Sequence, residues 1–155
     1  MPSPDLSRRA VVTGLGAVTP IGNDHPTFWR NLVAGVSGGG PITSFDATGY
    51  DVRIAAEVKD FDPTIAMDRK MARRMSRFIH LAMAAGKEAV QDAGLDFSDW
   101  SPERRDRVAV CVNTGGGGLD QVIDGAEVAR TKGPNFVSPF AIPAVSGSMA
   151  ACQLS

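Results

Sequence analysis

The chain has 155 residues, of which 43% are hydrophobic and 21% charged, and a formal net charge of −1. This composition is typical of one soluble globular domain, and the charge gives no support for a nucleic-acid or membrane partner. No apolar run approaches the roughly 20 residues of a transmembrane helix, and the opening MPSPDLSRRA lacks an apolar signal core, so we expect a cytoplasmic protein.

A polar lead-in, residues 1–8, precedes a short β-branched run, Arg9–Leu15, which we predict to be a strand. The glycines that follow partly match a dinucleotide-binding fingerprint, which needs a third small residue opening a helix. Thr19 and Pro20 stand at that point instead. The pattern therefore favours a turn, and we expect no cofactor.

The next elements are short. Asp24 as N-cap, followed by a proline, predicts a helix over residues 26–34 that Gly35 closes. Residues 37–50 read as a loop, and residues 52–58 as a short strand.

A basic segment, Asp68–Arg77, predicts a short helix that buries Met71 and Met75 and leaves its cations in solvent. The longest predicted helix, Ser76–Ala93, ends at Gly94 and carries a broad face of small residues suited to close packing against a helix or sheet. Its opposite, polar face carries His80, Ala84, Lys87 and Gln91.

The run Arg107–Val112 is apolar on both faces, which is typical of a central strand covered by helices on both sides. It leads into four glycines, 115–118, which allow a sharp turn and a close approach to a ligand or another chain. A helix is predicted over Leu119–Lys132, stopping at Gly133, and a helical pattern covers Ile142–Ser155. The residues of the first of these helices that we expect to be buried are Leu119, Val122, Ile123 and Ala126.

Six segments form a connected series in chain order: RRAVVTGLGAVTPIGN, FWRNLVAGVSG, FDATGY, AAEVKDFDP, RKMARRMSRFIHLAMAAGKEAVQDAGL and SPFAIPAVSGSMAA. The series resembles the amino-terminal part of a β-ketoacyl-acyl carrier protein synthase II, the condensing enzyme of type II fatty acid synthesis. The resemblance runs from about Arg9 to the last residue, with a few extra residues around Ser98–Glu103. Type II polyketide ketosynthases share much of the pattern and remain an alternative.

The resemblance implies an α/β protein, the amino-terminal part of a thiolase-like layered α/β/α/β/α fold that is incomplete in this chain. It implies a homodimer and a decarboxylative Claisen condensation. In that reaction an acyl group moves from acyl carrier protein to a cysteine, and malonyl-carrier protein then loses carbon dioxide and attacks the thioester. Two histidines stabilise the charge that develops, as oxyanion donors do.

The catalytic groups that the resemblance implies are not expected in this chain. The family's nucleophile lies in an Ala-Cys-x-(Ser/Thr)-Gly turn, and we expect residues 9–155 to end within a helix before it, giving a stretch inactive alone. Cys152 imitates that motif, but its position matches the preceding helix, and with Cys111 it reads as a buried free thiol. His25 and His80 match neither catalytic histidine and read as surface residues, and no metal site is expected.

Carrier-protein binding is the first site that the resemblance implies. Carrier proteins are acidic, and Lys70, Arg73 and Arg74 match the cationic landing positions; on a helix they share one face. A solvated basic face without a partner is the alternative, and nucleic acid is a weaker one because no second basic stripe or interleaved aromatics accompany the run. Asn135 and Phe136 replace a basic pair common in the family, so we expect weaker, salt-sensitive docking.

An acyl pocket at the dimer gate is the second implied site, at Gly116, Ala141 and Ile142. Gly116 and Ala141 are small where the family often has bulky residues, which predicts an open pocket unless neighbouring side chains refill it. A non-catalytic carrier-protein-binding or assembly module remains open as a different class of function.

Overall fold

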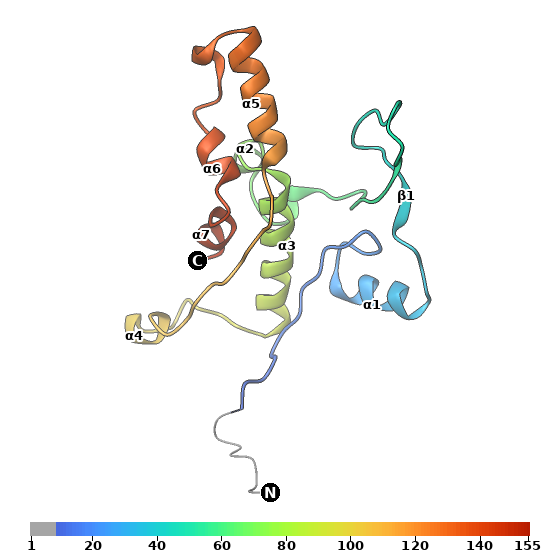
Figure 1. Ribbon diagram of the computed structural model, residues 1–155. Coiled ribbons are helices and arrows are strands. Elements are labelled where there is room, and N and C mark those ends of the chain that lie inside the picture. Colours follow the sequence, from blue (N-terminus) through green and yellow to red (C-terminus); the bar gives the residue numbers. More distant parts are fainter. Residues whose placement is uncertain (1–8) are drawn as a thin grey trace, which may run out of the picture.

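The computed structural model describes residues 9–155; the lead-in, residues 1–8, lies outside the described residues. Its helices are α1 (His25–Val33), α2 (Arg69–Ala72), α3 (Arg77–Asp92), α4 (Pro102–Arg105), α5 (Leu119–Thr131), α6 (Ala141–Val145) and α7 (Met149–Leu154). The strands are β1 (Gly39–Pro41) and β2 (Ile54–Ala56), and two 3-10 turns are η2 (Pro63–Ile65) and η3 (Pro134–Phe136). Helix α3 runs through the middle, and the other elements are arranged around it (Figure 1).

Helix α1 confirms the capping prediction. The Asp24 carboxylate accepts a hydrogen bond of 2.7 Å from the backbone N–H of Thr27, which satisfies one of the free donors of the first turn. The pKa of Asp24 is lowered chiefly by this hydrogen bond. The helix closes at Gly35, whose φ of 70° lies in the left-handed region that glycine adopts without strain.

The segment predicted as the first strand, Arg9–Leu15, is extended but pairs with no strand in residues 9–155, so this prediction is wrong for the chain as described. Val12 is 80% exposed. Carboxylates of α3 hold the segment's end instead: Leu15 N–H donates to Asp92 and Ala17 N–H to Glu88, both at 2.9 Å. Glu88 also accepts from the N–H of His25 at 2.8 Å, so α3 fixes the start of α1.

The predicted central strand, Arg107–Val112, likewise forms no strand in the described chain: Arg107 lies in a turn, and residues 108–112 pair with no other segment. A strand forms only where a neighbour supplies its hydrogen-bonding partners, and the one sheet among residues 9–155 is the antiparallel pair β1–β2. Cys111, on this segment, is exposed, as is Cys152 on α7; both thiols are free, as predicted, but the prediction that they are buried is wrong.

A small hairpin lies where residues 37–50 were predicted to be a loop. Strand β1 pairs with β2 in the register Gly39–Ala56, Gly40–Ala55 and Pro41–Ile54, so the predicted strand at 52–58 is confirmed in shortened form. Glu57 closes the hairpin's loop by accepting hydrogen bonds of 2.6–3.0 Å from the hydroxyls and backbone N–H groups of Thr43 and Ser44. These bonds, led by that from the Ser44 hydroxyl, lower the pKa of Glu57 to about 2.

Helix α3 is confirmed close to its predicted limits, and its small residues admit close neighbours. A Cβ atom on Gly86 would lie 2.6 Å from a methyl carbon of Leu154, so α7 packs against α3 at this glycine. Ala84, predicted on the polar face, is buried, because the η2 turn covers that side of α3. The predicted C-terminal helix is divided into α6 and α7 by residues 146–148.

Helix α5 occupies its predicted residues, but the prediction of its buried face is wrong. Leu119, Val122, Ile123 and Ala126 are all exposed. In Figure 1, α5 runs outward from the centre, and the segment returning through η3 and α6 lies along one side of it. The main neighbours of α5 among the described residues are therefore α6 and η3.

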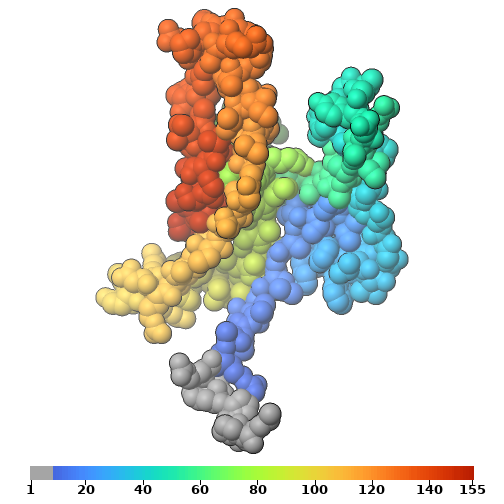
Figure 2. Space-filling view, viewed as in Figure 1, coloured from blue at the N-terminus to red at the C-terminus, as the bar shows by residue number. Residues whose placement is uncertain are grey.

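The molecule is open. Figure 2 shows α5, the hairpin and the α4 region projecting as separate lobes. The accessible surface is 11363 Å², against about 7,500 Å² expected for a compact monomer of this mass. The fully covered residues of the described part gather around α3 and are Ala66, Met67, Ser76, Ile79, Ala84, Ala144 and Ala150, with Gly22 and Gly118 covered at turns.

Candidate functional site

The basic segment forms a shorter helix than predicted. Asp68 caps α2 by accepting hydrogen bonds of 2.8 Å from the N–H groups of Lys70 and Met71, and the Met71 bond is the main cause of the lowered pKa of Asp68. The end of α2 is held by His80, whose Nε2 lies 2.8 Å from the carbonyl oxygen of Ala72. The prediction that His80 is only a surface residue is therefore wrong: it is half-buried and fixes α2 against α3.

The three predicted landing residues differ in their surroundings. Lys70 and Arg73 are exposed, whereas Arg74 is half-buried and its guanidinium carbon lies 4.2 Å from the ring centroid of Phe140. A cation over an aromatic face is stabilised by about 0.5–2 kcal/mol, depending on its exposure. The one ion pair found in residues 9–155 joins Arg130 to Glu127, so none of the three landing cations is neutralised by a carboxylate in this part of the chain.

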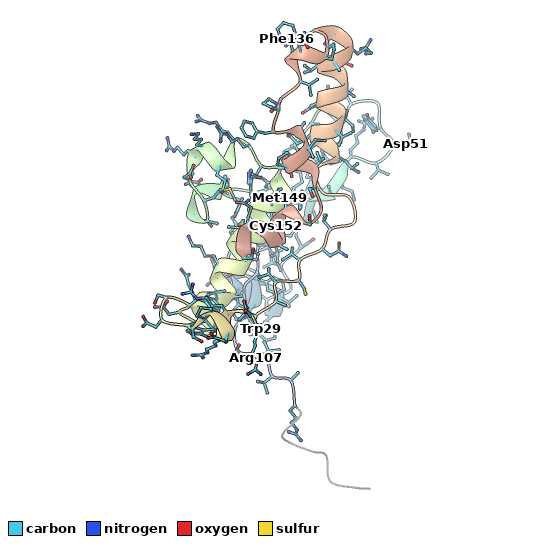
Figure 3. All side chains as sticks on the ribbon, turned by 90° about the vertical axis from the view of Figure 1, so that its left-hand side faces the viewer. Trp29, Asp51, Arg107, Phe136, Met149 and Cys152 are labelled. Carbon is cyan, nitrogen blue, oxygen red and sulfur yellow. The ribbon has the colours of Figure 1, made fainter. Side chains whose placement is uncertain are left out.

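A pocket of about 220 Å³ lies beside these arginines, between α2, α5 and the segment leading into α6. Its lining residues are Arg73, Arg74, Gln121, Asp124, Gly125, Val128, Phe136, Val137, Ser138, Phe140, Ala141 and Ala144. Two arginines and one carboxylate, Asp124, leave the lining with a net positive charge, and most of its other residues are apolar or aromatic. Phe136 is 70% exposed, and Figure 3 shows it at the outer end of the α5 arm. Such a pocket suits an acidic partner that also presents an apolar side chain.

Only one of the three predicted gate residues lines this pocket. Ala141 does, at the start of α6, while Ile142 is 77% exposed and does not line the pocket. Gly116 lies in the exposed turn before α5, where a Cβ atom would be 3.2 Å from a methyl carbon of Leu119. The structure therefore joins Ala141 to the cationic residues and leaves Gly116 apart from them.

The glycine turn makes a close approach at Gly118, but not to the ligand or second chain that the sequence predicted. Gly118 has a φ of 82°, and a Cβ atom there would lie 2.8 Å from the Cα of Val145. The neighbour is α6 of the same chain rather than a ligand. The glycine turn thus places the first residues of α5 against α6.

Sequence reasoning missed two residues that connect the site. Phe140 stacks under Arg74, and the Ser76 hydroxyl, which is buried, donates a hydrogen bond of 2.5 Å to the Ala144 carbonyl. Ser76 has the backbone angles of an N-cap for α3 but makes no side-chain cap. A small polar residue at a cap position is a signal for local capping, so nothing in the local pattern pointed to a partner 68 residues away.

A larger hollow, of about 700 Å³, lies between the hairpin and α3. Two of its charged groups are engaged within the chain: Glu57 is bound by Thr43 and Ser44, and Arg77 donates to the carbonyl of Val58 at 2.5 Å. Lys59 and Asp60 also line it and carry opposite charges. We therefore take the pocket beside Arg73 and Arg74 as the candidate site.

Comparison with known proteins decides the family. The family model described as the N-terminal domain of beta-ketoacyl synthase matches residues 7–155. The chain belongs to the β-ketoacyl synthase family.

Relatives of this family with curated names are similar over nearly the whole chain. The 3-oxoacyl-[acyl-carrier-protein] synthase 2 of Synechocystis sp. is 46% identical over 143 residues, which are 92% of this chain and 34% of the relative. The protein of the same name from Vibrio harveyi is 43% identical over 148 residues, 96% of this chain and 35% of the relative. The chain therefore spans about a third of the length of the curated relatives it matches.

The solved structure of the ishigamide ketosynthase/chain length factor is similar, with a TM-score of 0.79 and 31% sequence identity over 93% of this chain and 35% of that one. This confirms the predicted fold class: the chain has the amino-terminal part of the thiolase-like ketosynthase fold. The chain covers 35% of that structure, and this agrees with the unpaired segments and the exposed apolar residues of α5.

The chemistry of a β-ketoacyl synthase can be compared with the nucleophilic groups present. Cys152 lies within α7, where its N–H donates to the Ser148 carbonyl, so it sits in a regular helix turn (Figure 3). His25 begins α1 and His80 holds α2. Among residues 9–155 no three His, Cys, Asp or Glu side chains are grouped so as to hold a metal ion. The described helices are also all too short or too polar to cross a membrane.

Proposed function

We propose that this chain is the amino-terminal part of a 3-oxoacyl-acyl carrier protein synthase. The complete protein would condense an acyl thioester with malonyl-acyl carrier protein in fatty acid elongation. The 46% identity to the Synechocystis synthase carries this proposal. Residues 9–155 would form part of one ketosynthase domain, and would be inactive alone because the nucleophile and both histidines of the family lie in the other two-thirds.

The contribution of this chain would be to bind the carrier protein. The curated relatives bear the carrier protein in their names. Arg73 and Arg74 line a pocket that also contains aromatic side chains, Lys70 is exposed on α2, and none of the three is paired with a carboxylate among the described residues. Charges of one sign steer an oppositely charged partner and raise its association rate, while the apolar interior supplies contact area.

Titration of holo-acyl carrier protein from Synechocystis against the chain tests this role. We expect the Lys70→Glu/Arg73→Glu/Arg74→Glu variant to lose most of the binding at low salt, and the wild type to lose affinity as salt rises. The matched control is Arg104→Glu/Arg105→Glu/Arg107→Glu, which makes the same change in net charge around α4. If the landing-site variant binds as tightly as the wild type, these residues are only a solvated basic face without a partner.

The gate residues belong to the same proposal. Gly116, Ala141 and Ile142 would line the acyl pocket of the complete synthase, reached across the dimer. In a complete synthase carrying this segment, Gly116→Ile should lower turnover of long acyl primers more than short ones. An equal loss at every chain length would remove Gly116 from the pocket. Homodimerisation, measured by light scattering, and a cytoplasmic location are expected with it.

A type II polyketide ketosynthase is the second candidate, supported by the 31% identity to the ishigamide ketosynthase/chain length factor. The higher identity to the fatty acid synthases favours the first candidate. Competition between a fatty acid and a polyketide carrier protein for the chain would separate the two. A non-catalytic carrier-protein-binding module is the remaining alternative, and the intact mass of the protein isolated from its source tests it. A mass well above 16.3 kDa would favour the enzyme.

A further inference from the structure

Two residues of the segment between α2 and α3 contact the two ends of α6. Arg74 stacks on Phe140, which immediately precedes α6, at 4.2 Å. Ser76 donates a buried hydrogen bond to the carbonyl of Ala144, four residues further along. Four residues are about one turn of helix, so Arg74 and Ser76 contact α6 at the two ends of a single turn.

The two contacts differ in what can reach them. Ser76 is buried, so its contact has no access to a partner. Arg74 is half-buried and lines the pocket, its guanidinium carbon lies over the Phe140 ring, and it forms no ion pair with a carboxylate among residues 9–155. A guanidinium has five N–H donors, and a cation–π contact with a ring does not use them up, so Arg74 can also bind a carboxylate. One side chain can therefore hold Phe140 and an acidic partner at the same time.

Arg73 offers a contrast within the same pocket. It lines the same cavity and carries the same charge, yet it stacks on no aromatic ring among residues 9–155. Lys70 is exposed and does not line the cavity. Of the three cations, Arg74 is therefore the one that can transmit the binding of a partner to α6 through Phe140.

We propose that Arg74 is a positioning residue that couples occupation of the cationic pocket to α6, and so to Ala141 and Ile142. The proposal rests on the proposed carrier-protein function and adds to it. A carboxylate that binds the Arg74 edge restricts the guanidinium, which restricts Phe140 and the start of α6. Ser76 fixes the other end, so the first turn of α6 becomes more ordered when the carrier protein is bound.

Hydrogen–deuterium exchange of the α6 amides, with and without saturating holo-acyl carrier protein from Synechocystis, tests the coupling. The amides of Ala144 and Ser146, which donate to Phe140 and Ile142, report on the helix. In the wild type and in Arg73→Lys we expect carrier protein to slow their exchange several-fold. In Arg74→Lys, which keeps the charge but replaces the planar guanidinium by an ammonium group, carrier protein should bind but leave their exchange unchanged.

Variants at Phe140 separate coupling from a loss of packing. Phe140→Trp keeps an aromatic face and should keep the carrier-dependent slowing, whereas Phe140→Leu should lose it while still binding carrier protein. Binding without slower exchange in the wild type, or equal slowing in Arg74→Lys and Arg73→Lys, overturns the coupling alone. Absence of carrier-protein binding by the wild type overturns the proposed function, and the coupling with it.

Discussion

Helices α3 and α5 were predicted from the same kind of apolar periodicity, and the structure treats them differently. Helix α3 is covered by η2, α7 and the N-terminal segment, and Ile79 on it is completely buried. Helix α5 has neighbours along one side, and Ile123 on it is 67% exposed. Periodicity therefore predicts that a helix forms and which face is apolar, while burial depends on whether the covering element is present.

The largest expected effect compares one residue type in the two helices. Ile79→Ala should lower the free energy of unfolding by about 2–5 kcal/mol, because it removes buried methyl groups and leaves a cavity. Ile123→Ala should change it by no more than about 0.5 kcal/mol, as expected for an exposed position. Urea denaturation followed by circular dichroism measures both. Similar losses would mean that α5 is packed in solution, and the contrast between the helices would fail.

The second prediction concerns the junction of α3 with α6. Ser76→Ala removes the one hydrogen bond that the Ser76 hydroxyl makes within residues 9–155 and leaves the Ala144 carbonyl without that donor in a buried position. A loss of about 1–3 kcal/mol is expected from such an unsatisfied group. Ser148→Ala, at an exposed serine near the start of α7, is the matched control and should change stability little. Equal effects would show that the Ser76 bond is weak in solution.

The sequence predicted what depends on near neighbours along the chain. Asp24 and Gly35 bound α1, and Gly94, with a φ of 62°, follows α3, because caps and left-handed glycines act within a few residues. The two extended segments were misjudged because a strand needs a partner that its own sequence does not specify.

The same distinction holds at the candidate site. The cationic run was found from sequence, because its members lie close together in the chain. Its link to Phe140 joins residues 66 positions apart, and the pocket between them needs α5 and η3 as well. Residue type and spacing identify such cations but not the ring on which one of them stacks.

The third prediction concerns the β1–β2 hairpin. Like α5 it projects from the packed region, but the carboxylate of Glu57 stabilises its loop. The pKa of Glu57 is lowered to about 2 from 4.5 by its bonds from Ser44 and Thr43, so the carboxylate stabilises the folded hairpin above pH 4.5. That contribution should fade as the pH falls from 4.5 towards 2. The protection of the Thr43 and Ser44 amides, measured as their exchange relative to the intrinsic rate at each pH, should fall over this window in the wild type. In Glu57→Gln these amides should already be less protected at pH 6, and their protection should not change between pH 4.5 and 2. If the same pH dependence persists in this variant, it comes from other carboxylates.

The smallest expected effect uses the two cysteines, since each reports on one kind of region. Cys152 lies on α7, beside α3, and Cys111 on the unpaired extended segment; both are exposed. Iodoacetamide should therefore alkylate both in the folded chain at rates close to those of the urea-denatured chain, and acyl thioesters should protect neither. Mass spectrometry of the alkylated peptides measures each site separately. Protection of Cys111 alone would mean that a second copy or another chain covers the extended segment in solution. Rapid, selective alkylation of Cys152 that an acyl thioester blocks would contradict its assignment as a non-catalytic residue, because selectivity of that kind requires an activated thiolate in an acyl-binding site.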